Sequence, residues 1–159
     1  MRKLLILLLL PLLFLGCADS DSEIPVMKIV GVFMGGDEEE TNYANKFSEL
    51  PDLQVGDEVD IVFTLNGNGD DLKSFIVVND NAAIKTIMFF LGDEISLEFS
   101  ELNEGKAVFV DGVNDTWVTV KAKIVAPITE EQVLSFHLFS KAPEGAKAQL
   151  TFRASQSNK

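Results

Sequence analysis

Apolar and polar residues alternate along most of the chain after residue 24. Alternation with a period of two covers residues 59–65, 95–99, 118–124, 134–138 and 148–152. Less regular runs at 27–34, 73–78, 84–91 and 106–110 are rich in β-branched and aromatic residues. Because this period places successive side chains on opposite faces of a strand, the pattern predicts eight or nine short strands, each with one apolar face.

Turn-forming residues separate these runs. Examples are Asn-Gly-Asn-Gly at 66–69, Asn-Asp-Asn at 79–81 and Pro-Glu-Gly at 143–145. Short strands with one apolar face can bury those faces only against a second sheet. We therefore predict a single all-β domain over residues 24–154, an immunoglobulin-like antiparallel β-sandwich, with a small barrel as the alternative. A polar tail follows at residues 155–159.

Two stretches do not alternate. Tyr43, Phe47 and Leu50 are spaced four and three residues apart, which predicts one short helix near residues 38–49, with a long loop as the alternative. Residues 87–91, Ile-Met-Phe-Phe-Leu, are apolar on both faces of a strand. Such a strand is either buried on both sides in the middle of a sheet or lies at an edge that requires a partner.

The first residues predict export. Two basic residues precede an apolar run at 4–15, and Gly16 and Cys17 follow it. Twelve residues rise only about 18 Å as a helix, which is too short for a hydrocarbon core of about 30 Å. Residues 1–16 therefore read as a signal peptide. The five residues that end at Cys17, Leu-Phe-Leu-Gly-Cys, resemble a bacterial lipobox, with Phe14 where Leu is usual. The resemblance implies cleavage before Cys17 and acylation of its thiol.

Residues 17–23 form a predicted acidic tether between the acylated Cys17 and the domain. The stretch Ala-Asp-Ser-Asp-Ser-Glu is polar and self-repelling. It resembles the acidic export signals of Bacteroidetes lipoproteins, and a plain spacer is the alternative. The resemblance implies a lipid-anchored protein of the bacterial outer membrane that is exposed at the cell surface. The membrane is then a partner through the N-terminal lipid.

A second resemblance concerns the domain. Residues 55–59 leading to 72–75 are similar to the second and third strands of immunoglobulin-like domains in Bacteroidetes lipoproteins. The similarity in pattern spans residues 55–153 and contains no catalytic motif. It implies the fold and no particular activity, because those modules are mostly of unknown function.

Composition excludes several kinds of function. The 159 residues include 25 acidic and 13 basic side chains, a net charge of −12, and loss of Arg2 and Lys3 with the signal peptide makes it −14. This charge argues against a nucleic-acid surface. One Cys and one His exclude a disulfide framework and a Cys/His zinc site. We expect no cofactor and no metal, with calcium at the oxygen-rich loop 66–71, assisted by residues 111–115, as the alternative.

Trp117, His137 and Phe139 are the candidate ligand-contact residues. Alternation assigns their neighbours in the chain to the core, so these three side chains fall on outer, polar faces of the strands. Exposed aromatic residues that cluster are contact points for sugars or protein partners. The alternatives are that Trp117 covers one end of the sandwich and that His137 is an ordinary half-exposed strand residue.

These observations predict a class of function without an identified ligand. We expect a non-enzymatic, lipid-anchored cell-envelope protein, a surface binding or accessory module whose partner is an extracellular protein or glycan. The alternatives are a small hydrolase that uses clustered carboxylates and a purely structural envelope component.

Overall fold

The computed structural model describes residues 22–36 and 41–153. Within these ranges the chain forms eight strands and two 3₁₀ turns. The strands are β1 (Val26–Met34), β2 (Glu58–Asn66), β3 (Leu72–Val78), β4 (Ile84–Phe90), β5 (Lys106–Val108), β6 (Asp115–Ile124), β7 (Gln132–Ser140) and β8 (Ala146–Phe152). The 3₁₀ turns are η1 (Phe47–Glu49) and η2 (Leu102–Glu104).

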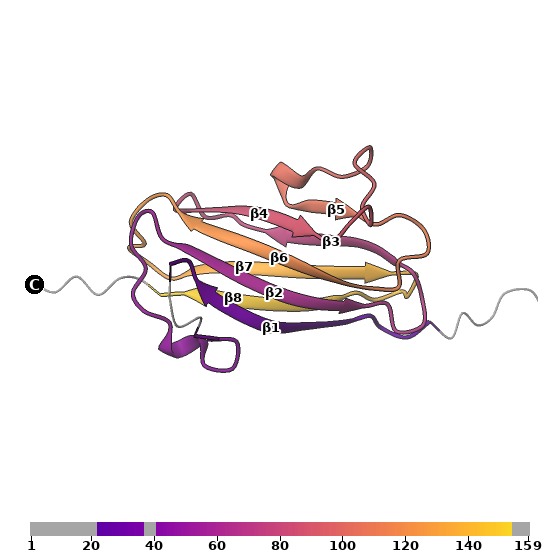
Figure 1. Cartoon of the computed structure of the whole chain (residues 1–159), viewed down its shortest axis with the longest axis horizontal. Coiled ribbons are helices and arrows are strands. Elements are labelled where there is room, and N and C mark those ends of the chain that lie inside the picture. The colour runs from indigo at the N-terminus through magenta and orange to yellow at the C-terminus, as the bar shows by residue number, and fades with distance from the viewer. Residues whose placement is uncertain (1–21, 37–40, 154–159) are drawn as a thin grey trace, which may run out of the picture.

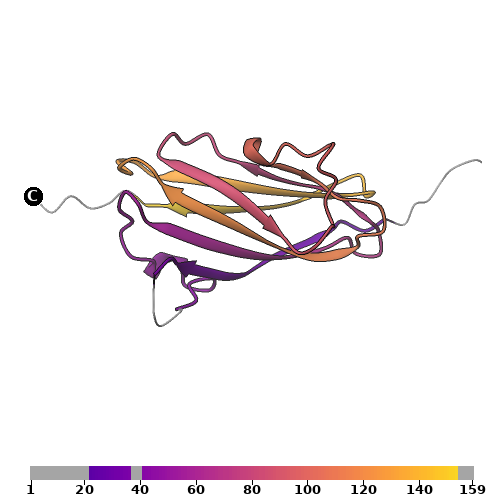
Figure 2. The same cartoon turned by 45° about the horizontal axis from the view of Figure 1, so that its top comes forward.

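The strands form two four-stranded antiparallel sheets that pack face to face (Figures 1 and 2). Sheet A has the order β1-β2-β6-β4, and sheet B has the order β5-β3-β7-β8. The strands of sheet A occupy the positions of A, B, E and D in an immunoglobulin-like sandwich, and β3, β7 and β8 occupy those of C, F and G. The predicted sandwich is confirmed, and the alternative of a closed barrel is wrong.

The core consists of the apolar faces that alternation predicted. In β2, β6 and β7 every second residue is buried, as the sequence pattern requires. Phe63 of sheet A packs between Phe75 and Phe136 of sheet B, with ring centroids 5.5 Å and 4.7 Å away. These three rings are fully buried and join the two sheets at the centre.

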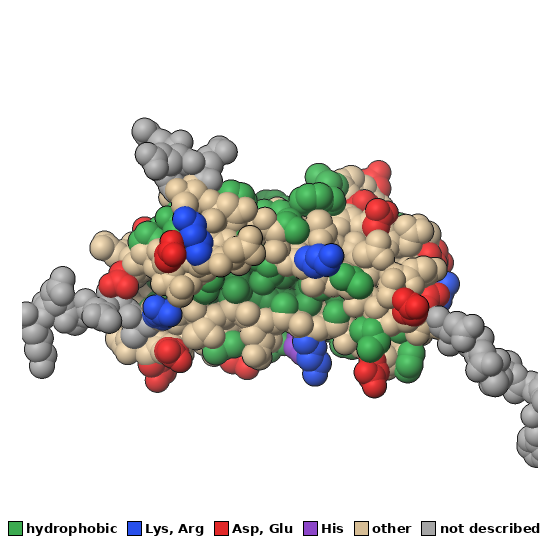
Figure 3. Space-filling model, turned by 90° about the horizontal axis from the view of Figure 1, so that it is seen from below, with side chains coloured by type: hydrophobic (Ala, Val, Ile, Leu, Met, Phe, Trp, Pro, Cys, Tyr) green, Lys and Arg blue, Asp and Glu red, His purple; other side chains and the backbone are tan. Residues whose placement is uncertain are grey.

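The side of the sandwich between β1 and β8 is less completely closed. Met27 and Ile29 of β1, together with Ala148 and Leu150 of β8, are partly buried and pack against the core. Seen from this side, a strip of hydrophobic side chains runs along the middle of the molecule (Figure 3). Strand β1 also contains a bulge between Ile29 and Gly31, which bends an edge strand away from regular pairing.

The short helix predicted near residues 38–49 is wrong in its described part, residues 41–49, where only the three-residue turn η1 is helical. The side chain of Asn42 explains the difference, because its Oδ1 accepts hydrogen bonds from the backbone N–H groups of Val32 and Ala44. The Tyr43 N–H also donates to the Val32 carbonyl, at 2.8 Å. Asn42 therefore ties this segment to the edge of β1, which competes with helix formation.

The strand predicted at residues 95–99 is also wrong. Ile95 forms an isolated bridge with Phe109, and the chain then reverses, with the Phe99 N–H donating to the Ser96 carbonyl. Leu97 and Phe99 are left exposed on this turn. Alternation alone misled here because a strand also needs a neighbour along its whole length, and the reversal removes it.

Candidate functional site

Strand β4 is an edge strand with apolar residues on its outward face. It pairs with β6 and ends sheet A on that side. Met88 points inward and is buried, whereas Ile87, Phe89 and Leu91 expose 54%, 51% and 62% of their surface. Of the two interpretations of the apolar run at 87–91, the edge strand is confirmed and the central strand is wrong.

Trp117 lies on the same outer face as these residues. It is 51% exposed and stands opposite Thr64 in the pairing of β6 with β2. On the other side of β6, Phe89 stands opposite Thr119, so Trp117 and Phe89 are diagonal neighbours, about 7–8 Å apart at the backbone. We call Ile87, Phe89, Leu91 and Trp117 the sheet A patch. Trp117 does not cover an end of the sandwich.

His137 and Phe139 lie on the opposite side of the molecule. Both belong to β7 in sheet B, and their rings are parallel, with centroids 6.4 Å apart. Phe139 is 38% exposed. The three candidate residues therefore do not form one patch, because Trp117 is on the outer face of sheet A. Sequence alternation distinguishes inner from outer faces, but it does not say to which sheet a strand belongs.

The backbone of β4 has a free edge. The Ala83 carbonyl accepts a hydrogen bond from the Val125 N–H, at the end of β6. The Ile84 N–H donates to the Asn81 carbonyl, and the Ile84 carbonyl accepts from Asn79 Nδ2, so both groups of Ile84 point away from β6. Since bonding alternates along an antiparallel pair, the N–H and C=O groups of Thr86, Met88 and Phe90 also face away from β6. No described residue forms a hydrogen bond with these groups.

A groove of about 710 Å³ runs beside this free edge. The first four residues of β4 line it, together with the end of β3, the loop after β3, and η2 with Gly105; outward residues of β2 and β6 complete the lining. The lining residues are Glu58, Val77, Asn79, Asn81, Ala82, Ile84, Lys85, Thr86, Ile87, Asn103, Glu104, Gly105, Lys121 and Lys123. The groove therefore combines apolar side chains with amides, lysines and two carboxylates.

The carboxylates nearest to this groove on sheet A are held in ion pairs. Glu58 Oε2 lies 2.9 Å from Lys121 Nζ, and Glu58 Oε1 lies 3.0 Å from Lys123 Nζ. Hydrogen bonds from Lys121 and then Lys123, with their positive charges, lower the pKa of Glu58. The bond to Glu58 raises the pKa of Lys121, and Asp60 adds to the effect. Glu58 therefore stays ionised, which does not suit a general acid.

The two oxygen-rich loops lie side by side but use their groups within the fold. The Gly67 N–H donates to the Asn114 carbonyl, and the Leu72 N–H donates to the Val113 carbonyl. Asp71 pairs with Lys141, whose hydrogen bond lowers the pKa of that carboxyl. Among the residues that the structure describes, no three His, Cys, Asp or Glu side chains are grouped to hold a metal ion.

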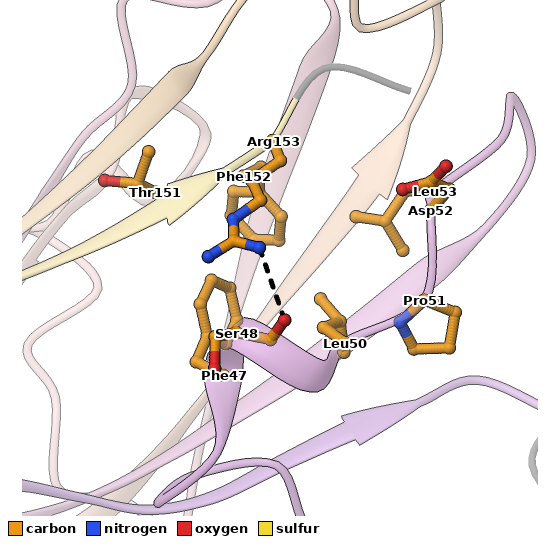
Figure 4. A pocket seen from close by; sticks show the side chains of 9 residues that line it. All are labelled: Phe47, Ser48, Leu50, Pro51, Asp52, Leu53, Thr151, Phe152 and Arg153. Carbon is orange, nitrogen blue, oxygen red and sulfur yellow. Dashed lines mark hydrogen bonds between the residues drawn. The ribbon is translucent and has the colours of Figure 1, made fainter. Parts of the chain in front are cut away.

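The segment before β2 closes one end of the sandwich. Phe47 of η1 packs edge-on against Phe152 of β8, with ring centroids 5.5 Å apart, and Arg153 Nη1 donates to the Ser48 carbonyl. A cavity of about 150 Å³ remains between these residues and Leu50 (Figure 4). Its lining comes from the β1–β2 connection and the end of β8, which pack on each other, so we assign it to packing.

The predicted signal peptide, residues 1–16, and Cys17 lie outside the described residues, as do positions 154–159. In the part of the chain that the structure describes, no helix is long and apolar enough to cross a membrane. The tether comes into view at its end, where Asn68 Nδ2 donates to Glu23 Oε2 at 2.7 Å and to the Ile24 carbonyl at 3.2 Å.

Sequence analysis did not assign the outward face of β4 to the site, although it singled out the run that forms it. The usable signal was the two-sided apolar character of residues 87–91, which is unusual for an edge strand. Leu97 and Phe99 were missed as exposed residues because their alternation resembled that of a buried strand.

The fold defines an immunoglobulin-like β-sandwich with one exposed, partly apolar sheet edge. Its sequence family is shown by a family model, described as a domain of unknown function (DUF5035), that matches residues 17–154. The chain belongs to this family. The comparison with curated proteins found no match.

Three solved structures are similar to the chain. A lipoprotein from Bacteroides thetaiotaomicron, solved by solution NMR, is 13% identical, with a TM-score of 0.48 over 89% of this chain and 88% of that one. BslA, a bacterial hydrophobin, is 11% identical, with a TM-score of 0.39 over 80% and 95%. A family 123 glycoside hydrolase from Clostridium perfringens is 11% identical, with a TM-score of 0.40 over 83% of this chain and 27% of that one.

Proposed function

We propose that this protein is a non-enzymatic, lipid-anchored protein of the bacterial outer membrane that binds an extended segment of another protein along β4. The anchor rests on the basic start, the apolar run and the lipobox-like residues that end at Cys17. Cys17 is the first residue of the range that the family model matches.

The free edge of β4 is the observation that carries the binding role. Its unpaired N–H and C=O groups match the backbone of an added strand, which is how extended peptides join an exposed sheet edge. The groove beside the edge leaves room for such a segment. Ile87 and Phe89 lie next to the added strand on the outer face, where its side chains would cover them. A glycan has no backbone to complete this ladder, so an extracellular protein is the favoured partner.

The ion pairs around the groove support a non-enzymatic role. A hydrolase with two carboxylates needs one that stays protonated to act as the acid. The lysines that contact Glu58 favour its charged form instead. The hydrolase remains the alternative from the enzyme class, and measurable turnover of a glycan by the purified protein would establish it.

Photo-crosslinking on intact cells tests the binding role. With Ile87 replaced by p-benzoylphenylalanine, we expect an adduct of protein composition. Thr86→Pro removes one free-edge N–H without removing a bond to β6 and should abolish the adduct. Thr86→Val keeps the N–H and should retain it. An adduct that survives Thr86→Pro in a folded protein would contradict strand addition.

The anchor is tested separately. A fatty-acid analogue supplied to cells should label the wild-type protein, and Cys17→Ala should abolish the label and release the protein from the membrane. Label that persists in the variant would refute acylation of Cys17.

A further inference from the structure

The tether and several exposed apolar residues of the outer face of sheet A lie at the same end of the molecule. The register pairs Val26 of β1 with Asn66, and Asn66 with Asp115, so the start of β1 and the start of β6 coincide. Phe90, the last residue of β4, stands opposite Val118. We call this the anchor end, because β1 begins there directly after the tether (Figure 1).

Four large apolar side chains are exposed at the anchor end. Leu91 and Trp117 are part of the sheet A patch, and Ile24 and Val26 stand near the start of β1, with Ile24 half exposed. Val26 and Trp117 share the outer face because both are in register with outward residues of β2. We call Ile24, Val26, Leu91 and Trp117 the anchor-end patch.

The strands carry few charges in this part of the face, although the mature chain carries −14, and the acidic residues Glu23 and Asp93 flank the patch in sequence. Paired residues of neighbouring strands form rows across the outer face of the sheet. In the three rows nearest to the anchor end, the charged residues are Lys28 and Asp115. The two rows at the other end hold Glu58, Asp60, Lys85, Lys121 and Lys123. Of the acidic residues after Leu91, Glu94 is directed to the Thr116 hydroxyl. In these rows the anchor end therefore has fewer charged side chains to desolvate against lipid than the other end of this face.

The tether restricts where this end can be. Six residues separate Cys17 from Ile24, and a chain of that length spans at most about 25 Å. Asn68 also fixes the exit of the chain by bonding to Glu23 and Ile24. An acylated Cys17 thus keeps the anchor-end patch near the headgroups at high effective concentration.

We propose that the anchor-end patch lies on the bilayer that holds the lipid of Cys17, with the Trp117 ring in the interfacial region. This inference rests on the proposed lipid anchor. Trp is enriched at membrane interfaces because its ring is apolar and its N–H is polar. In this orientation only the anchor end of sheet A meets the membrane, and the groove beside β4, which is lined by residues at the other end of the sheet, stays open.

The sole Cys and the sole Trp of the chain allow a direct test. The mature chain from Cys17 onward is coupled through its thiol to a maleimide lipid in phosphatidylcholine vesicles. Trp117 fluorescence is then recorded with and without lipids brominated near the headgroup. We expect a blue shift of the emission maximum on coupling and loss of emission with the brominated lipids. An emission maximum that stays unshifted and unquenched would overturn the proposal and leave the patch to a protein partner.

Two variants locate the contact. Leu91→Asp places a charge in the anchor-end patch and should restore most of the quenched emission, whereas Val133→Asp, an exposed position on the outer face of sheet B, should leave the quenching unchanged. Both should melt as the wild type does. Equal quenching in all three proteins would contradict docking through this patch. Since coupling is chemical, the result does not depend on acylation in the cell, which the fatty-acid label reports separately.

Discussion

The outer faces of the two sheets follow the same alternation but differ in how their side chains are supported. On sheet B, the Phe139 ring is parallel to His137 and rests close to Gly145, and Gln149 donates to the Ser135 hydroxyl at 3.0 Å. On sheet A, Lys121 and Lys123 pair with Glu58 at one end, while Trp117, Phe89 and Leu91 have little cover at the other. On the outer face of sheet A, the large apolar side chains thus gather away from the ion pairs of Glu58, and we take them as the contact residues.

The largest expected effect comes from the core that both sheets share. Phe136→Ala removes a fully buried ring that contacts Phe63 across the sandwich. We expect a loss of about 3–5 kcal/mol in the free energy of unfolding, because a cavity remains after the truncation. Urea denaturation measures it. A loss below about 1 kcal/mol would show that the sheets do not pack through these rings.

A smaller effect is expected from the supported face of sheet B. A Cβ at Gly145 would lie 2.7 Å from the Leu138 carbonyl oxygen and 2.8 Å from Phe139 Cδ1. Gly145→Ala should therefore cost about 1–3 kcal/mol, since the backbone or the ring must move. Urea denaturation and the ring-current shift of the Phe139 protons would report it together. If the free energy of unfolding and the ring-current shift both keep their wild-type values, the Phe139 ring is no better supported than Trp117.

Acid should weaken the paired end of sheet A. Glu58 has a lowered pKa in the folded state, below its usual 4.5. Its contribution to stability is present above the pKa of the unfolded chain and is lost as the pH falls through the folded value. Glu58→Gln should lower stability at neutral pH and make the decline below about pH 4.5 less steep than in the wild type. Denaturation curves from pH 7 to 3 decide it, and parallel curves would contradict the ion pairs.

The smallest effect is expected at Trp117. Truncation of an exposed, unsupported ring should change the free energy of unfolding by no more than about 0.5 kcal/mol. Urea denaturation of Trp117→Ala, followed by circular dichroism, is the measurement. A loss of several kcal/mol would show that the ring is part of the core, and the membrane proposal would lose its central contact residue.

The sequence predicted the fold well because alternation is a local property. In β2 and β7 most residues reveal by their polarity whether they face the core, with Val62 and Phe139 as apolar exceptions on the outer faces. The turns at 66–69 and 143–145 mark where strands end. The failures at 38–49 and 95–99 arose where a single interaction redirects the chain, the Asn42 side chain in one case and the reversal at Ser96 in the other.

The candidate site was predicted only in part, for a different reason. Alternation correctly placed Trp117, His137 and Phe139 on outer faces, but the neighbours of a strand depend on the pairing of segments far apart in the chain. The position of Trp117 diagonal to Phe89 follows from the pairing of residues 84–90 with 118–124. Nothing local in either segment specifies that pairing.

The Asn42 contact has a further consequence, which concerns how many molecules can join. Asn42 and Tyr43 bond to Val30 and Val32 on the β1 edge of sheet A, so that edge is partly occupied by the chain itself. Beyond Ile84, no described residue covers the β4 edge in this way. Sheet A is thus open at β4 and partly obstructed at β1. A second molecule that adds a strand at β4 therefore finds no equivalent place at the middle of β1, which disfavours growth of a continuous sheet through sheet A.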